Sequence, residues 1–310
     1  MIGALLTLSL AAATLCAMTA RVLWFGDLAV HFRLQYAVLG LIGMVLFLLV
    51  RQPEWAVLAL AVAAFNFIAA VPAMTSRPPP VLHAAPAATD PQKVRVVAIN
   101  VLYASHAYQR VADVIHLERP DVVVLVEMNA RWHRGLEEAE REYPHRYQTR
   151  GASRRGVTLW SRFPMTDVGE LPMETHDEPA IGATVQIGSR TLRVFAVHTS
   201  WPMWPAAARR RNLQLARMAD LARATSMPLV AVGDLNITPF SPHFQQLLAD
   251  GRLRSAAEGF RWVPTWPVFL PAAGIQIDHG LVNAAVTVQG FRRGSTDGSD
   301  HRPIILDLLL

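Results

Sequence analysis

Cysteine is almost absent from the sequence, since Cys16 is the single one among 310 residues. One cysteine excludes an intramolecular disulfide, so cysteine usage does not indicate the compartment. The sequence also lacks an HExxH motif and any cluster of cysteine and histidine. These absences disfavour a zinc centre. No internal repeat is visible either.

Charged residues are also scarce, at 17% of the sequence, against 52% hydrophobic residues and a mean hydropathy of +0.25. This is too apolar for an ordinary soluble protein, and almost all of the excess lies in residues 1–75. The remaining part, about 220 residues, is long enough for one well-buried domain. The net charge of +5 and the pI near 10.0 fit an anionic partner, such as phosphate, nucleic acid or lipid head groups, and equally a solvated surface.

Three long apolar runs account for the hydrophobic excess, over residues 1–20, 34–50 and 56–74. Runs of this length span the hydrocarbon core of a bilayer. Trp24 and Trp55 lie at their ends, where amphipathic aromatic side chains prefer the interface. We therefore expect three transmembrane helices. The alternatives are a buried helical bundle and, for the first run, a signal peptide, which the absence of a preceding basic residue disfavours.

Residues 75–92 are rich in proline and alanine, and we expect a stiff linker there, between a transmembrane region (1–74) and a folded domain (93–310). The segment 21–33 carries two arginines, against Arg51 alone on the other side, so the positive-inside rule places the domain in the cytoplasm. Linkers of this composition often tether domains outside the membrane. We favour this second arrangement, an integral protein of the cell membrane with its domain on the extracytoplasmic face.

From Val94 onward, apolar strand patterns alternate with helical ones. The expected strands cover residues 94–99, 121–126, 157–160, 184–187, 191–197, 228–232, 276–283, 287–291 and 304–310. The expected helices cover residues 108–117, 131–142, 206–224 and 241–249, and the second of them is charged and should be exposed. This pattern predicts an α/β domain of two sheets with outer helices.

The most informative stretch is residues 227–239, MPLVAVGDLNITP. An apolar run of the kind that forms a buried strand ends at Gly233, and Asp234 and Asn236 follow it. Side chains two residues apart on an extended backbone point to the same side, so both should face one pocket. The alternative is an Asx turn that caps a helix beginning near Ser241.

Polar side chains also stand at the ends of the other predicted strands, where α/β folds place their sites. They are Asn, Asp, Glu or His throughout: Asn100, Glu127, His198, Asp234, Asn236, Asp278, His279, Asp300 and His301. Independent loop caps would not account for so uniform a set. Carboxylate and amide oxygens suit Mg²⁺ or Mn²⁺, and a histidine oriented by a carboxylate is a common general base. The chemistry that this set indicates is phosphoester hydrolysis.

Three motifs follow in order: GDLN at 233–236, QIDHGL at 276–281 and GSDHRP at 298–303. Together with the earlier Asn and Glu, they resemble the endonuclease/exonuclease/phosphatase (DNase I-like) superfamily. That superfamily includes nucleases, sphingomyelinases and inositol polyphosphate 5-phosphatases. The resemblance covers about residues 94–310 and implies a four-layered α/β sandwich, in which two mixed sheets are flanked by helices.

The resemblance also implies a role for each matching residue. Glu127 would be the main ligand of a Mg²⁺ or Mn²⁺ ion, and Asn100 would help to organise that metal site. His301 would be the general base and Asp278 would orient it. Asp300 would complete the environment of the metal ion or of the base.

The same resemblance assigns three residues to the reacting phosphate group. His198 would contact the scissile phosphate, Asn236 would hold one of its oxygens, and Asp234 would orient the nucleophile or assist the leaving group. His279 is expected to be structural. Some nucleases of the superfamily carry an acidic residue where this sequence has Leu102, which disfavours a second metal site there.

The residues that follow His198 bear on substrate binding. Trp201, Trp204 and the run Arg209–Arg211 would form an aromatic and basic lip beside the site, with Arg209 pairing with phosphate. The alternative is that the two tryptophans pack in a loop over the core. A lip next to membrane helices favours a lipid-linked phosphate ester as substrate.

Two other hypotheses remain open. The first is a DNA or RNA nuclease of the same superfamily, in which the basic cluster Arg150, Arg154 and Arg155 would track a nucleic acid backbone. No pattern of stacking aromatic residues accompanies that cluster. The second is a catalytically silent binding module on a membrane stem, which the intact set of site residues disfavours. The sequence indicates no protein partner.

Overall fold

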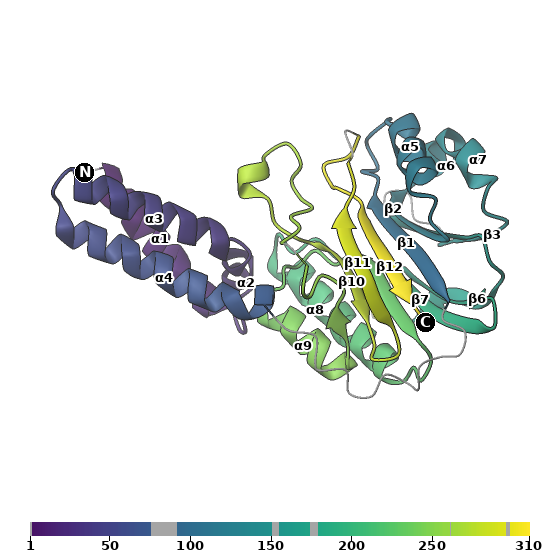
Figure 1. The fold of residues 1–310 in the computed structure, drawn as a ribbon. Coiled ribbons are helices and arrows are strands. Elements are labelled where there is room, and N and C mark those ends of the chain that lie inside the picture. The colour runs from purple at the N-terminus through teal and green to yellow at the C-terminus, as the bar shows by residue number, and fades with distance from the viewer. Residues whose placement is uncertain (1, 76–91, 151–154, 174–178, 261, 296–297) are drawn as a thin grey trace.

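The computed structural model describes residues 2–75, 92–150, 155–173, 179–260, 262–295 and 298–310. Most of the linker that the sequence predicts over residues 75–92 lies outside the described residues. An N-terminal arm, residues 2–75, extends from one side of an α/β domain that begins with the strand at Lys93 (Figure 1).

Four helices form the N-terminal arm: α1 (Ile2–Met18), α2 (Trp24–Val30), α3 (Arg33–Leu49) and α4 (Pro53–Thr75). Of the described helices, α4 is the one that is long and apolar enough by itself to cross a membrane. α3 qualifies only when it is joined to α2, to which it is bent by 62°, and α1 has 17 residues. Of the three predicted transmembrane helices, the one over residues 56–74 is thus supported as a single span. The polar segment after the first apolar run is itself helical, as α2, and its Asp27 and His31 are buried.

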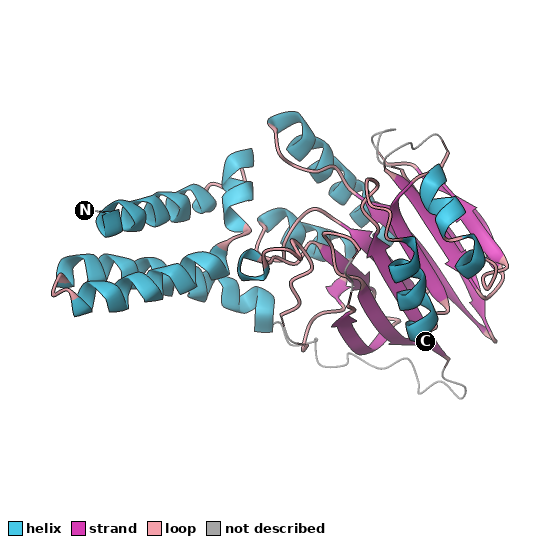
Figure 2. Cartoon of the chain, turned by 90° about the horizontal axis from the view of Figure 1, so that it is seen from above, coloured by secondary structure: helices cyan, strands magenta, loops and turns pink. Residues whose placement is uncertain are grey.

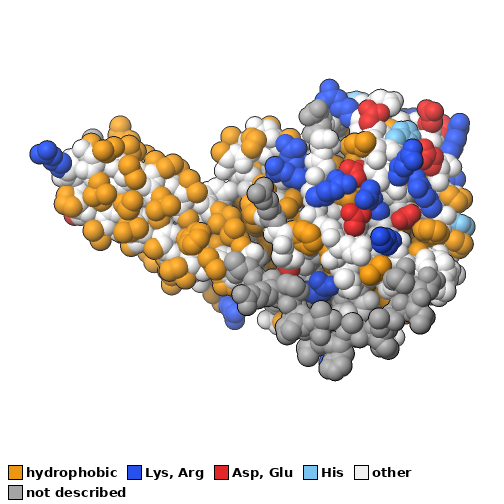
Figure 3. All heavy atoms as spheres, viewed as in Figure 1, with side chains coloured by type: hydrophobic (Ala, Val, Ile, Leu, Met, Phe, Trp, Pro, Cys, Tyr) orange, Lys and Arg blue, Asp and Glu red, His pale blue; other side chains and the backbone are white. Residues whose placement is uncertain are grey.

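Apolar side chains cover the outside of the N-terminal arm (Figure 3). Leu6, Leu49 and Ile68 are 62%, 74% and 69% exposed. Apolar surface of this extent on a soluble protein marks an interaction surface. The arm is therefore unlike a helical bundle buried within a protein.

The α/β domain contains two six-stranded sheets. In the first sheet the order is β11 (Thr287–Arg293), β12 (Ile304–Leu309), β1 (Lys93–Asn100), β2 (Val122–Met128), β4 (Gly156–Ser161) and β3 (His145–Gln148). In the second it is β5 (Met165–Leu171), β6 (Ala180–Ile187), β7 (Arg190–His198), β8 (Leu229–Asp234), β10 (Asp278–Val282) and β9 (Arg254–Ser255). The pairs β1–β2 and β7–β8 are parallel and the other pairs antiparallel, so both sheets are mixed.

The sheets pack face to face, and helices cover their outer faces (Figures 1 and 2). The first sheet carries α5 (Tyr108–Glu118), α6 (Ala130–Gly135) and α7 (Glu137–Glu140), and the second carries α8 (Pro205–Arg223) and α9 (Pro242–Gly251). The central strands are buried on both faces, which is why they read as continuous apolar runs. This arrangement confirms the predicted α/β fold of two mixed sheets flanked by helices.

Two kinds of local prediction were wrong. Residues 131–142 do not form one exposed helix but the short helices α6 and α7, and Trp132 is fully buried. A Cβ on Gly135 would lie 2.3 Å from the ring of Tyr108, so the chain passes too close to α5 there for any other side chain. The strands β3, β5 and β9 were missed because they lie at sheet edges, where half-exposed residues give no apolar run.

Candidate active site

The polar residues at the strand ends meet at one edge of the two sheets. β1 ends at Asn100, and its parallel neighbour β2 carries Glu127. β7 ends at His198 and β8 at Asp234, and these two residues are partners in the parallel ladder. β10 runs antiparallel to β8, so its first residue, Asp278, lies opposite Asp234. Strand pairing therefore brings Asn100 close to Glu127 in the first sheet, and His198 and Asp278 close to Asp234 in the second. The packing of the two sheets then joins both groups, through Asn100 and Asp234.

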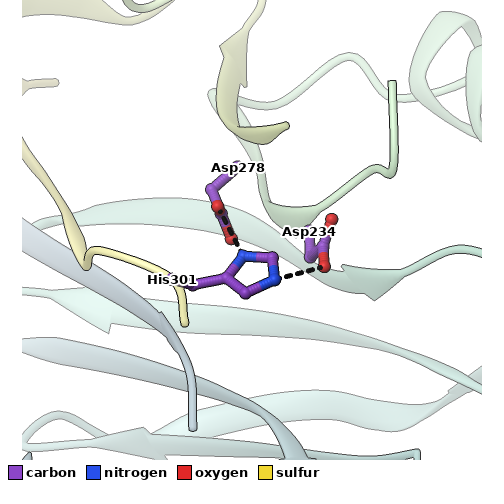
Figure 4. Close-up of side chains that lie close together, drawn as sticks. All are labelled: Asp234, Asp278 and His301. Atoms are coloured by element: carbon purple, nitrogen blue, oxygen red, sulfur yellow. Dashed lines mark hydrogen bonds and ion pairs between the residues drawn. The ribbon is translucent and has the colours of Figure 1, made fainter. Parts of the chain in front are cut away.

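His301, in the loop before β12, lies between two carboxylates (Figure 4). Its Nδ1 atom is 2.9 Å from Asp278 Oδ2, and its Nε2 atom is 3.8 Å from Asp234 Oδ2. All three side chains are buried. A carboxylate at Nδ1 fixes the proton on that nitrogen. Nε2 is then the ring nitrogen that is able to exchange a proton.

The two carboxylates also shift the pKa of His301. Burial lowers this pKa, but the charges of Asp278 and Asp234 and the hydrogen bond to Asp278 outweigh burial, and the pKa rises to about 10. Burial raises the pKa of Asp234 to about 7, against the opposing charge of His301. Positive charge brought near these carboxylates would lower both values, so the proton on His301 is sensitive to a bound cation.

Asn100 connects the His301 group to Glu127. Its Nδ2 atom lies 3.0 Å from Glu127 Oε1 and 3.1 Å from Asp234 Oδ2. The second carboxylate oxygen of Glu127 accepts a hydrogen bond of 3.0 Å from the backbone N–H of Tyr103. One amide thus spaces two carboxylates that would otherwise repel each other.

The backbone at Glu127 is unusual, with a φ of 64°. This left-handed conformation is uncommon for residues other than glycine and tends to occur at functional sites. It coincides with an irregularity in the pairing of β2 with β4, between Val126 and Met128. A bulge re-aims a side chain, and here it affects the one residue of β2 that lies in the site.

The donor set fits a divalent cation. Within the described residues, Asp234, Asp278 and His301 offer ligand atoms that all lie within 4.8 Å of one another. Glu127 adds a further carboxylate, joined to Asp234 through Asn100. Oxygen ligands of this kind suit hard cations such as Mg²⁺ or Mn²⁺. The Nδ1 of His301 is already engaged by Asp278 and is not available as a ligand.

Asn236 lies beside Asp234 in a constrained backbone. Its φ is 48°, its N–H donates to Asp234 Oδ1 at 2.9 Å, and its Nδ2 donates to the backbone oxygen of Thr199 at 2.9 Å. Asp234 therefore uses Oδ1 to accept the backbone hydrogen bond of an Asx turn, whereas its Oδ2 faces Asn100 and His301 in the site. The N-cap of α9 is Ser241, whose Oγ accepts from the N–H of His243.

His198 is a neutral histidine at the same edge. Burial lowers its pKa to about 4. Its Nε2 atom is 3.9 Å from Asp234 Oδ2, and its buried Nδ1 has no hydrogen-bond partner among the described residues. The ring is able to donate or accept one hydrogen bond without carrying charge at neutral pH.

His279 lies outside this group. Its Nε2 atom is 2.8 Å from the backbone oxygen of Ile237, its ring packs against Phe244 at 4.6 Å, and burial lowers its pKa to about 4. These contacts match the structural part that the sequence indicates for it.

Asp300 is held on the His301 side of the site. Its Oδ2 atom accepts a hydrogen bond of 3.0 Å from Trp266 Nε1, and its charge contributes to the raised pKa of His301. It is not part of the Asp234, Asp278 and His301 group. Its position fits the environment of the base better than that of a metal ion.

The aromatic and basic lip that the sequence predicts beside the site is present only in part. Trp201 and Trp204 are 51% and 47% exposed and lie edge to face at 6.4 Å, so they do not pack over the core. Arg209 is exposed, but Arg211 is completely buried and cannot join the lip. The sequence predicts Arg211 at the surface, since its buried partner, Asp27, is 184 residues away along the chain. Of the second basic cluster, Arg154 lies outside the described residues.

Several supporting residues were missed. The Oγ of Ser299 donates to the backbone oxygen of Asn100 at 2.7 Å and accepts from the N–H of His301 at 3.1 Å. The Oγ of Thr265 accepts from the N–H of Asp278 at 3.2 Å. Ser299 lies within the GSDHRP motif, which could have indicated it, whereas Thr265 carries no sequence signal.

The comparisons with known proteins agree with this geometry. The model of the endonuclease/exonuclease/phosphatase family matches residues 97–301, which is more than half of the chain. The chain belongs to this family, as the motifs predict, and the class of protein is a metal-dependent hydrolase of phosphoester bonds. No curated protein matches the chain.

Solved structures show the same fold. A family member from Beutenbergia cavernae is 25% identical, with a TM-score of 0.56, and the match covers 71% of this chain and 72% of that one. TDP2 of D. rerio, complexed with a single-strand DNA product, is 15% identical with a TM-score of 0.61, over 70% and 98% of the two chains. Sphingomyelinase C from Streptomyces griseocarneus is 17% identical with a TM-score of 0.54, over 69% and 99%.

Proposed function

We propose that the protein is a membrane-anchored, Mg²⁺-dependent phosphoesterase with His301 as its general base. The observation that carries this proposal is the contact of 2.9 Å between His301 Nδ1 and Asp278 Oδ2, with Nε2 left facing Asp234 and Asn100. A base held in one tautomer at a strand edge lined with oxygen ligands suits attack of water on phosphorus.

The residues divide the reaction between them. His301 Nε2 takes a proton from the attacking water while the water oxygen bonds to phosphorus and the ester oxygen departs with its electron pair. Asp278 orients the ring, and Asp234 orients the water or assists the leaving oxygen. His198 and Asn236 hold the phosphate oxygens. Glu127, with Asn100 beside it, would hold Mg²⁺ or Mn²⁺, and the ion would neutralise charge on the phosphate.

A lipid-linked phosphate ester is the substrate class that we favour. The apolar outer surface of the N-terminal arm supports a position at a bilayer, with α4 as a span. Trp201, Met203 and Trp204, which shortly follow His198, are 44–51% exposed and suit an interface. Arg209 is exposed beside them for a phosphate. We place the catalytic domain on the extracytoplasmic face.

The test uses the full chain in detergent or lipid vesicles, with Mg²⁺ or with EDTA. Substrates are a phospholipid panel, a polyprenyl pyrophosphate and plasmid DNA. We expect EDTA-sensitive release of phosphate or head group from a lipid, with the plasmid intact. Nicking of the plasmid at a comparable rate would make the protein an anchored nuclease instead. A folded chain that is inactive on every substrate would favour the binding module.

A further inference from the structure

The short helix α2 of the N-terminal arm contacts the loop that follows β8. Asp27 Oδ1 accepts a hydrogen bond of 2.5 Å from Ser241 Oγ, and His31 Nδ1 lies 2.9 Å from Thr238 Oγ1. Asp27 and His31 are four residues apart and so share one face of the helix. All four side chains are almost completely buried. This face of α2 is therefore fitted to the loop after β8, which contains Asn236.

A buried arginine joins α2 to Asn236 itself. Arg211, on α8, pairs through Nη2 with Asp27 Oδ2 and donates from Nη1 to the backbone oxygen of Asn236 at 3.0 Å. Arg211 and Asp27 are 0% and 2% exposed. A buried charge is tolerated only with a well-placed partner. The guanidinium of Arg211 is thus held by Asp27 and by Asn212, whose Oδ1 accepts from Nε at 2.8 Å, and it holds the carbonyl of Asn236 in turn. Asp27 is the partner that carries the compensating charge.

Asn236 depends on such support. A left-handed backbone is strained for a residue with a side chain and persists where its surroundings fix it. Three bonds fix Asn236: its N–H to Asp234, its side chain to Thr199, and its carbonyl to Arg211. The bond to Arg211 connects Asn236 to the N-terminal arm, because Arg211 also pairs with Asp27.

The arm and the domain also share apolar packing at this place. Phe240, in the same loop, stacks on Trp262 at 5.0 Å and packs with Ala17, Val30 and Ala70 of the arm. Asp27 thus lies in a buried interface between the arm and the domain.

We propose that α2 is a positioning element of the active site, in which Asp27 acts through Arg211 to hold Asn236 in its binding position. The proposal rests on the proposed function insofar as Asn236 holds a phosphate oxygen. The N-terminal arm would then be required for full activity as well as for attachment to a membrane, and phosphate binding would respond to how the arm is docked.

The test compares Asp27→Asn and Arg211→Lys with the full wild-type chain in detergent. Arg211→Lys keeps the charge that compensates Asp27 but loses the planar fork that reaches both partners, so it remains informative if Asp27→Asn does not fold. The control is Gln35→Ala, which removes another contact between arm and domain, the bond of 3.0 Å from Gln35 Nε2 to the backbone oxygen of Gly274.

Two measurements are made on each variant, namely amide hydrogen exchange over residues 235–241 and kcat with KM on the ester hydrolysed in the assay above. We expect faster exchange confined to this loop, and a fall in kcat of about tenfold to a hundredfold, since a small displacement of a positioning group has effects of this size. Gln35→Ala should change neither.

Wild-type exchange and kcat in both variants would overturn the proposal, and so would an equal effect of Gln35→Ala. A fall in activity that only matches the fraction of unfolded protein would overturn it as well. If the wild-type chain hydrolyses no phosphoester but the loop still exchanges faster in both variants, the proposed function fails and the positioning by α2 stands.

Discussion

The Nδ1 atom of His301 lies 2.9 Å from a carboxylate oxygen of Asp278, and the carboxylate of Asp234 lies 3.8 Å from the other ring nitrogen. The two carboxylates act differently on the ring, because one fixes its orientation by a hydrogen bond and the other adds charge beside the nitrogen that exchanges protons.

Replacing the base should abolish most hydrolysis. We expect His301→Ala to lower kcat about a hundredfold or more, as general-base catalysis is worth at least about that much, with the melting temperature little changed. His116→Gln is the matched control, since His116 is on the surface, paired with Glu142. Residual activity above roughly a tenth of wild type would remove His301 from this role.

The orienting carboxylate should control the pH dependence. The charge and hydrogen bond of Asp278 raise the pKa of His301, so Asp278→Asn lowers it. A base works when deprotonated, so the rising limb of kcat/KM against pH should move to lower pH. The maximal rate should fall by about tenfold or more, because the ring loses its orientation. A limb that stays at the wild-type pH would show that another group titrates there.

The role proposed for Glu127 as a metal ligand should be measurable in a metal titration. Glu127→Gln keeps the shape of the side chain but removes the charge that attracts a cation. We expect the Mg²⁺ concentration at half-maximal activity to rise about tenfold or more, since ligand and supporting residues of metal sites contribute about ten- to a hundredfold to affinity. Glu137→Gln, at an exposed position of α7, is the control. An unchanged titration would exclude Glu127 as a ligand.

The exposed tryptophans should matter for substrates held in a bilayer. With Trp201 and Trp204 both replaced by serine, hydrolysis of a lipid ester in vesicles should fall about tenfold or more, because burying one large apolar side chain contributes about 1.5–3 kcal/mol. Hydrolysis of a short soluble ester should fall much less. Leu117→Ser, at a position 76% exposed on α5, is the comparison. Equal losses on both substrates would argue against a membrane role.

The folded protein should become less stable in acid, because the buried ring of His279 takes up a proton less readily than it does in the unfolded chain. Burial lowers its pKa from 6.5 to about 4, so the folded protein keeps the ring neutral and stability is full above pH 6.5. As the pH falls from 6.5 to 4, protonation favours the unfolded state, by about 2 kcal/mol at pH 5. His279→Gln should reduce this slope in urea unfolding measured between pH 7 and 5. The same slope in the variant would assign the effect to other groups.

The sequence predicts which residues lie together in the candidate site better than it predicts their surroundings. Asn100, His198 and Asp234 each stand where an apolar strand ends, and Asp278 stands where one begins, and these positions are visible without a structure. The bulge at Glu127 is not, because its left-handed backbone depends on how β2 pairs with β4.

Long-range burial was the main source of error. Arg211 follows two other arginines and reads as a surface residue, yet it pairs with Asp27 at a distance of 184 residues along the chain. Asp27, in turn, reads as part of a loop between apolar runs. Neither residue carries a local pattern that indicates its partner, so the docking of α2 could only be seen in three dimensions.

The ladder between β8 and β10 sets Asp234 opposite Asp278 through backbone pairing, which does not depend on the identity of nearby side chains. The segment after β7, with its tryptophans, and the one before β10 are not part of that ladder. Relatives could thus exchange these two segments, and with them the molecules they accept, while the spacing of the two carboxylates is inherited unchanged. The segments that select the substrate would then change while the residues that carry out the reaction stay the same, because the two lie on separate parts of the chain.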